Sequence, residues 1–295
     1  MSTRVPVLLH GFVDDAAVFP PGNAALPDAV AAHRDIRTGW YAGMVGPLLL
    51  PASSLAAVTA ELAPDERLAV GVIGDTGLAG LGGALAGADP RLDIRQIEVA
   101  VAKRGEDPQP GLATAIEFAR ALSGGTLYAE VPLTFGMLGA LDTIAAARRE
   151  GVPIAAKFRT GGLAAELFPT PIELAAVICA CRDRDLPFKL TAGLHHALRH
   201  ADRETGFTHH GFLGVLAGVL GAVHDRAEVA DVAALLASEN PAVPVDTVRP
   251  HRDAPRPLWV GFGSCSIPEP LADLVRLGIL TGPSEPASTI DGQRV

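Results

Sequence analysis

The chain has 295 residues, a formal net charge of -9 and 48% hydrophobic residues. This length is enough for one large domain, and a β/α barrel commonly needs about 250 residues. The negative charge disfavours binding to nucleic acid or to an anionic membrane surface, so we exclude both partners. No apolar run of about 18 residues predicts a membrane span, and the first residues do not resemble a signal peptide. We therefore expect a cytoplasmic protein.

Eight short aliphatic runs, each followed by Gly, Pro or Asp, alternate with segments rich in Ala and Leu. This alternation predicts repeated strand–helix units. The expected strands are Val5–Val13, Gly46–Pro51, Leu68–Gly74, Arg95–Ala102, Thr126–Val131, Pro153–Arg159, Pro187–Gly193 and Leu258–Cys265. The expected helices include one that begins near Leu26, and Ser53–Leu62, Pro110–Leu122, Leu138–Arg149 and Pro171–Arg184. Eight such units predict a single-domain (β/α)8 TIM barrel, with an open doubly wound sheet as the alternative.

Two segments depart from the regular spacing of the units. Residues 194–257 form a long connection between the seventh and eighth expected strands, with two helices and a Pro-rich run. Insertions after a barrel strand lie at the catalytic face, so we expect a lid or a pocket wall there. The barrel is expected to span residues 1–281, and the polar segment 282–295 is expected to be a flexible tail.

Lysine is rare in this chain, which has 24 Lys and Arg residues but only three lysines. Two of them, Lys157 and Lys189, lie in the sixth and seventh expected strands. A buried amine is costly, but it can lose its proton and attack a carbonyl carbon, which a guanidinium cannot do. Two ammonium groups on adjacent strands also repel each other, which lowers the pKa of one of them. We therefore predict that Lys157 forms a Schiff base and that Lys189 lowers its pKa.

Other residues complete this hypothesis or compete with it. Glu130, in the fifth expected strand, or His195, after the seventh, is expected to move protons. Alternatively, the two lysines form structural ion pairs with Glu98 or Glu130, or they bind a phosphate or carboxylate as simple cations.

Five of the nine histidines lie within residues 195–210. Histidine can carry protons or bind metals near neutral pH. The alternative function is therefore a metal-dependent barrel hydrolase or isomerase, with a divalent metal as its cofactor. Its expected ligands are His195, His196, His209 and His210 with Asp14 or Asp15. The Schiff-base hypothesis requires no cofactor.

Arg159 ends the sixth expected strand, and Thr160 and Gly161 follow it. A guanidinium, free backbone N–H groups and the N-terminus of the next helix suit an anion at that position. An ordinary turn between strand and helix explains the glycine equally well.

Three segments of the chain resemble the deoxyribose-phosphate aldolase family, which are class I aldolases with a β/α barrel. The sixth strand of that family ends in Lys-x-Ser-Thr-Gly, and Lys157-Phe158-Arg159-Thr160-Gly161 matches at Lys, Thr and Gly. A second Lys before a Gly pair in its seventh strand is similar to Lys189-Leu190-Thr191-Ala192-Gly193. Its phosphate-binding Gly-Thr/Ala-Ser-Ser turn is similar to Gly263-Ser264-Cys265-Ser266.

The resemblance implies an imine at Lys157 and binding of a substrate or its phosphate. The residues that it implicates in this binding are Arg159, Thr160, Gly161, Gly193, Ser264 and Ser266. The chain departs from the family in its fourth strand, where Glu98-Val99-Ala100 replaces a Glu-x-Asp pair whose Asp transfers protons. The histidines after the seventh strand also lack a family counterpart.

These observations favour an enzyme, a class I aldolase-like lyase that acts on a small anionic carbonyl metabolite. The metal-dependent enzyme is the second hypothesis, and a non-catalytic barrel that binds a phosphorylated metabolite is the third. The expected partner is a small anionic substrate, and the sequence leaves open whether the chain forms a homo-oligomer.

Overall fold

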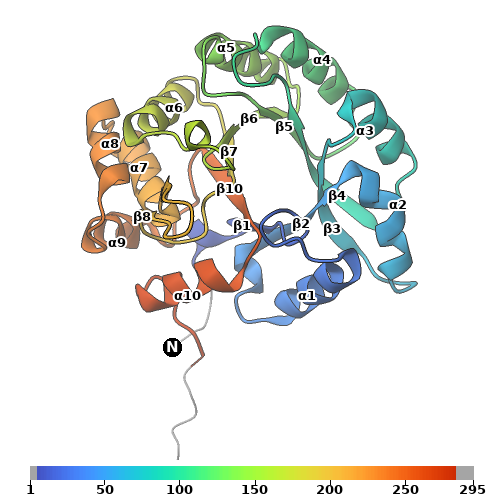
Figure 1. Cartoon of the computed structure of the whole chain (residues 1–295), viewed down its shortest axis with the longest axis horizontal. Coiled ribbons are helices and arrows are strands. Elements are labelled where there is room, and N and C mark those ends of the chain that lie inside the picture. The colour runs from blue at the N-terminus through green and yellow to red at the C-terminus, as the bar shows by residue number, and fades with distance from the viewer. Residues whose placement is uncertain (1–4, 284–295) are drawn as a thin grey trace, which may run out of the picture.

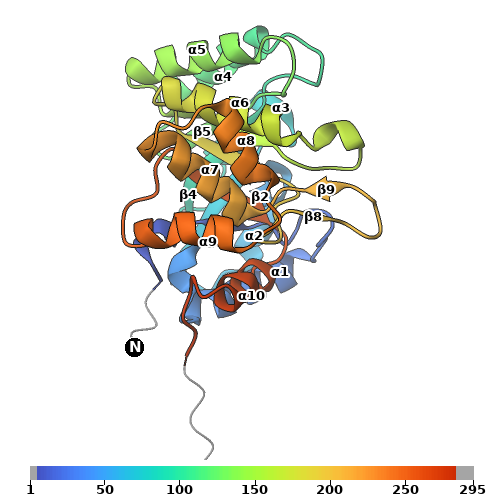
Figure 2. The same cartoon turned by 90° about the vertical axis from the view of Figure 1, so that its left-hand side faces the viewer.

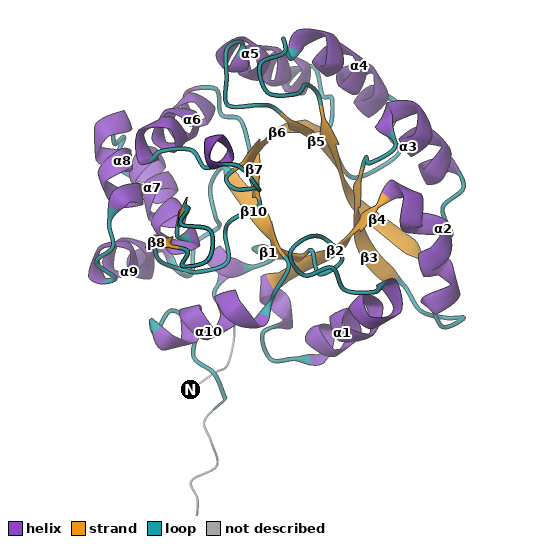
Figure 3. Cartoon of the chain, in the orientation of Figure 1, coloured by secondary structure: helices purple, strands orange, loops and turns teal. Residues whose placement is uncertain are grey.

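A closed barrel of eight parallel strands forms the centre of the protein (Figures 1 and 3). The computed structural model describes residues 5–283. The strands follow the order β1-β10-β7-β6-β5-β4-β3-β2 around the barrel. Their bounds are β1 Val13–Asp15, β2 Val45–Pro51, β3 Leu68–Ile73, β4 Leu92–Ala100, β5 Thr126–Glu130, β6 Ile154–Arg159, β7 Phe188–Thr191 and β10 Trp259–Ser264. The predicted TIM barrel is confirmed.

Helices surround the barrel on its outer face (Figure 3). Their bounds are α1 Leu26–Thr38, α2 Leu55–Val58, α3 Gly77–Ala86, α4 Gln109–Arg120, α5 Met137–Arg149, α6 Pro171–Asp183, α7 Phe212–His224, α8 Val229–Ala237, α9 Ala242–Val248 and α10 Pro268–Arg276. The expected helix Ser53–Leu62 is broken, because only α2 is α-helical and the turns on either side of it are 3-10. Among residues 5–283, no helix has both the length and the apolar character needed to cross a membrane.

The first strand is much shorter than the expected Val5–Val13. Residues Val7–Leu9 form a 3-10 helix instead, and Gly11 adopts a φ of +55°, which extended strand does not use. Arg256 fixes this segment by donating hydrogen bonds to the carbonyl oxygens of Leu8 and His10, and to those of Trp259 and Val260 on β10. The chain before β1 therefore packs against the start of the last barrel strand.

Residues 194–257 add more structure than the two helices expected there. A small antiparallel hairpin, β8 (His200–Ala201) and β9 (Thr208–His209), precedes α7, α8 and α9. Figure 2 shows the hairpin projecting from one side of the molecule. It follows β7, and so it lies at the end of the barrel where TIM-barrel active sites form. The tail expected from residue 282 lies almost entirely outside the described residues.

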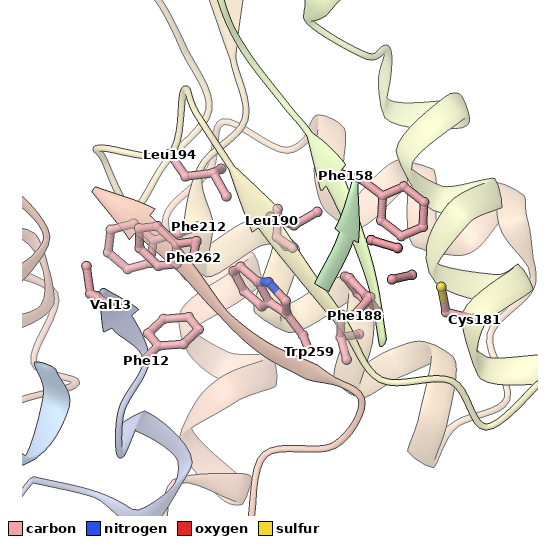
Figure 4. Packing of buried hydrophobic residues seen from close by; sticks show 14 of the residues in the cluster. Phe12, Val13, Phe158, Cys181, Phe188, Leu190, Leu194, Phe212, Trp259 and Phe262 are labelled. Carbon is pink, nitrogen blue, oxygen red and sulfur yellow. The ribbon is translucent and has the colours of Figure 1, made fainter. Parts of the chain in front are cut away.

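Alternate residues of the barrel strands face in opposite directions. Phe158 and Phe188 lie on the outer side with their rings 6.1 Å apart, in the hydrophobic layer under the helices (Figure 4). Because neighbouring residues of a strand point to opposite faces, Lys157 and Lys189 point into the barrel. The two lysines are also register partners on β6 and β7.

The connections that follow β6 and β7 touch each other. The Oγ1 of Thr160 donates a 2.6 Å hydrogen bond to the carbonyl oxygen of Ala192. Ala192 and Gly193 both adopt positive φ values, +64° and +77°. A Cβ added at Gly161 would lie only 2.8 Å from the Cα of Gly193. Glycine at position 161 therefore allows the two loops to meet at the barrel mouth.

We predict that Gly161→Ala destabilises the protein by about 1–3 kcal/mol, because its methyl group overpacks the contact between these loops. Urea unfolding measures the change. Gly83→Ala is the matched control, because a Cβ at that position of α3 meets nothing within 4 Å. The control should be neutral or stabilising by up to about 1 kcal/mol. Equal stability of the two variants would contradict the close contact.

Candidate active site

Glu98, on β4, lies at the centre of a buried charged cluster inside the barrel. Its Oε2 is 2.7 Å from the Nζ of Lys157, and its Oε1 is 2.5 Å from the Nζ of Lys189. The side chain is 1% exposed. A single carboxylate therefore separates the two ammonium groups and contacts both.

Lys157 also contacts a second carboxylate, which leads toward solvent. Its Nζ is 2.8 Å from the Oε2 of Glu130, and the Nε of Arg159 donates a 3.0 Å hydrogen bond to the Oε1 of Glu130. The side chains of Lys157, Glu130 and Arg159 are 5%, 17% and 43% exposed. This gradient places Arg159 at the mouth, Glu130 below it and the Lys157 amine next.

Lys189 lies on the opposite side of Glu98, fully enclosed. It forms an ion pair with Asp14 of β1, and the Nε2 of Gln96 donates a 2.7 Å hydrogen bond to the same Asp14 oxygen. The ring of Tyr128 lies 5.5 Å from the Lys189 Nζ. Lys189 is thus held entirely by protein groups.

The carboxylates set the charge states of the cluster. Burial by itself would lower the pKa of Lys157, but Glu98 and Glu130 outweigh burial and raise this pKa above its ordinary value. Asp14 and Glu98 likewise overcome burial and raise the pKa of Lys189. Burial opposes ionisation of Glu98, yet the two lysines bring its pKa down to about 2.

The expectation that Lys189 lowers the pKa of Lys157 is therefore wrong. The two lysines are on adjacent strands, as expected, but Glu98 lies between their amines and stabilises both positive charges. The ion pairs with Glu98 and Glu130, which were the structural alternative, are present.

The residues expected to bind an anion lie in three places. Arg159 is at the mouth, whereas Thr160 is buried and its hydroxyl bonds to the loop after β7. Gly161 and Gly193 form the contact between the two loops. The Oγ of Ser264 donates a 2.7 Å hydrogen bond to the carbonyl oxygen of Ser266, within the turn that follows β10.

The histidines expected to bind a metal do not contact Asp14 or Asp15. His195 lies 3.4 Å from Glu269, and His196 lies 3.3 Å from Asp273 of α10. His209 donates a 3.0 Å hydrogen bond to the carbonyl oxygen of Gly193. Asp14 pairs with Lys189, as described above. These four histidine and aspartate side chains therefore have separate partners.

The two remaining expected ligands are also engaged elsewhere. Asp15 lies 2.9 Å from the Nδ1 of His33 on α1, and His210 donates a 2.7 Å hydrogen bond to the carbonyl oxygen of Pro169. Burial lowers the pKa of His210 to about 4, so this side chain is neutral at pH 7. In the described part of the chain, no three His, Cys, Asp or Glu side chains are grouped so that they could hold a metal ion. The residues expected as metal ligands do not fit a shared metal centre.

Two charged residues of the cluster have other roles in the sequence-based hypotheses. Glu98 is there an alternative ion-pair partner of the lysines, and Asp14 is a base or a metal ligand. The available signal was the polar pair Gln96 and Glu98, two residues apart in a part of β4 where Ile97 and Val99 are apolar and buried. Such alternation indicates that these two side chains face the same side of the strand.

A cavity of about 120 Å³ lies beside the mouth, between the connections that follow β4, β5 and β6. Glu130 and Arg159 form part of its wall. The cavity is therefore adjacent to the side of the cluster that carries the Lys157 amine.

Comparison of the chain with protein-family models, with curated proteins and with solved structures gives no match. The resemblance to the aldolase family thus stays a prediction from three short segments.

We predict that Glu98→Gln destabilises the protein by about 3–5 kcal/mol at pH 7, because it leaves two buried ammonium groups without their shared counter-charge. The free energy of unfolding in urea measures the effect. Glu150→Gln is the control, because it breaks an exposed ion pair in which Glu150 Oε2 lies 2.7 Å from a terminal nitrogen of Arg120. Such an exposed pair contributes at most about 1 kcal/mol. A loss in Glu98→Gln no greater than in the control would show that Glu98 does not balance the lysines.

Proposed function

We propose that this protein is a Schiff-base-forming lyase, similar in chemistry to class I aldolases, that acts on a small anionic carbonyl metabolite. Lys157 is the nucleophile in this proposal. The observation that carries it is the position of the Lys157 amine, between two carboxylates and directly below the barrel mouth.

The energetic cost of the cluster supports a functional role. Buried ion pairs contribute little net stability, because the desolvation of each charge offsets the attraction between them. A packed apolar barrel interior would stabilise the fold at least as well. Five ionisable side chains from β1, β4, β5, β6 and β7 are therefore better explained by chemistry than by folding.

Lys157 suits the nucleophile better than Lys189 does. The Lys157 amine contacts Glu130, which reaches toward solvent, whereas Lys189 is enclosed by Asp14 and Glu98. Lys189 acts in this proposal as a fixed positive charge that keeps Glu98 ionised. This replaces its expected role of lowering the Lys157 pKa.

Glu130 is placed to move the protons of imine formation. It takes one proton from the Lys157 ammonium, and the neutral amine attacks the carbonyl carbon to form a C–N bond. One proton of the attacking nitrogen passes to the carbonyl oxygen, which becomes a hydroxyl group. Glu130 then returns the first proton to this hydroxyl, which leaves as water, and a protonated imine remains.

The imine then accepts electrons during cleavage. A hydroxyl group two carbons away loses its proton to Glu130, the C–C bond breaks, and the electron pair passes into the imine to give an enamine. The protein supplies all these groups itself, so the reaction needs no cofactor. His195 contacts Ser264 and Glu269, so its expected part in proton transfer is assigned to Glu130 instead.

We predict that borohydride, added with small aldehydes and 2-oxo acids, traps a covalent adduct on Lys157. Peptide mass mapping locates the adduct. Lys157→Arg should abolish it, because a guanidinium keeps the charge but forms no imine. Lys103→Arg, which replaces an exposed lysine, should leave it unchanged. An adduct on neither Lys157 nor Lys189 across the panel would refute the proposal.

We also predict that the rate of trapping rises with pH between pH 6 and pH 10. The raised pKa of Lys157 keeps its amine protonated at neutral pH, and the reactive fraction grows by up to about tenfold per pH unit.

Glu130→Gln removes one of the two carboxylates that raise the Lys157 pKa, so the pH profile of trapping in this variant should shift to lower pH, with a lower maximal rate. An unshifted profile would show that Glu130 does not control the amine.

A further inference from the structure

The cavity beside the proposed site is lined by apolar and charged side chains in similar measure. The apolar part of the wall consists mainly of Val131, Pro132, Leu133, Leu167 and Pro169, from the connections after β5 and β6. Its volume of about 120 Å³ is well below the roughly 300–1,000 Å³ of pockets for drug-sized ligands. It therefore suits a short apolar group.

The charges around the cavity favour a singly charged ligand. Arg104 and Arg159 line it, but so do Glu130, Glu166 and Glu173. A phosphate dianion would face three carboxylates with only two guanidinium groups to balance them. A single carboxylate requires less positive charge.

Arg159 is able to bind such a carboxylate. Its Nε donates to Glu130, and within residues 5–283 its two terminal nitrogens form no hydrogen bond. Arg159 lies two residues after Lys157 on β6, so both side chains leave the strand on the same face. A ligand whose carboxylate binds Arg159 would thus place an adjacent carbonyl group near the Lys157 amine.

Two exposed apolar side chains lie in the connections that also line the cavity. Phe135, in the connection after β5, and Leu163, in the connection after β6, are 95% and 96% exposed. Their exposure leaves apolar surface in the two connections that also form part of the cavity wall.

We infer that the substrate class is a 4-hydroxy-2-oxo acid with a short apolar side chain, whose hydroxyl group is the one that the proposed cleavage requires. Its carbonyl carbon reacts with Lys157, its carboxylate binds Arg159, and its side chain occupies the cavity lined by Leu133 and Leu167. This inference rests on the proposed function, and it departs from the phosphorylated substrate that the family resemblance implies.

Borohydride trapping on Lys157 with three probes tests the inference: pyruvate, 4-methyl-2-oxopentanoate and glycolaldehyde phosphate. The branched acid should reach half-saturation at a concentration about tenfold or more below that of pyruvate, because its side chain leaves water for the cavity. Glycolaldehyde phosphate should require the highest concentration. Equal half-saturation by the two oxo acids, or tightest binding of the phosphate, would overturn the inference.

Leu133→Asn locates the preference at the cavity. The half-saturation constant of pyruvate divided by that of 4-methyl-2-oxopentanoate should fall about tenfold in this variant. Val275→Asn is the control, because Val275 is a partly exposed apolar residue of α10 that does not line the cavity. The control should keep the wild-type ratio. A ratio that falls equally in both variants would contradict the assignment.

Calorimetry with 4-methylpentanoate separates failure of the inference from failure of the proposed function, because this acid has no reactive carbonyl. Trapping on Lys157 without an apolar preference would refute the substrate class but not the Schiff base. Binding of 4-methylpentanoate that Leu133→Asn weakens, without any adduct, would refute the Schiff base and show a carboxylate site alone. Neither binding nor an adduct would refute both.

Discussion

The contact of Glu98 with both lysines determines the charge balance of the barrel interior. Each carboxylate oxygen faces one ammonium group, so two positive charges that would repel each other are bridged by one negative charge. Glu130 and Asp14 are the second carboxyl contacts of Lys157 and Lys189, respectively. The consequence is an interior in which no single charge can be removed or neutralised without affecting its neighbours. Under the proposed function, the Lys157 amine becomes a nucleophile only when its proton moves to a carboxylate.

The opposite half of the barrel provides the space for these side chains. A Cβ on Gly46 of β2 would lie 1.9 Å from an Asp14 oxygen, and one on Gly71 of β3 would lie 2.8 Å from Gln96. The absence of side chains at these two positions therefore lets long polar side chains extend across the barrel. The small residues on β2 and β3 leave the volume that the charged side chains on β4 to β7 fill.

The number and order of the barrel strands could be predicted because each strand–helix unit is a local pattern of hydrophobicity. The first strand was misplaced because Leu8, Leu9 and Phe12 are buried, as strand residues would be, although they belong to a different conformation. The rarity of lysine pointed to Lys157 and Lys189, and both belong to the buried charged cluster. The predicted lowering of the Lys157 pKa was wrong because Glu98 lies between the two lysines. Glu98 belongs to a strand about 60 residues before Lys157, and the sequence alone does not show that the two side chains are in contact.

The Arg256 guanidinium joins the chain before β1 to the start of β10, on which the closure of the barrel depends. The residues that form this seam are therefore separated by almost the entire chain. During translation the strands emerge in order, and β1 has no partner on its β10 side until the last strand has left the ribosome. Asp14 and Lys189 accordingly remain hydrated for most of synthesis, so desolvation of the charged interior is delayed until one of the final steps of folding.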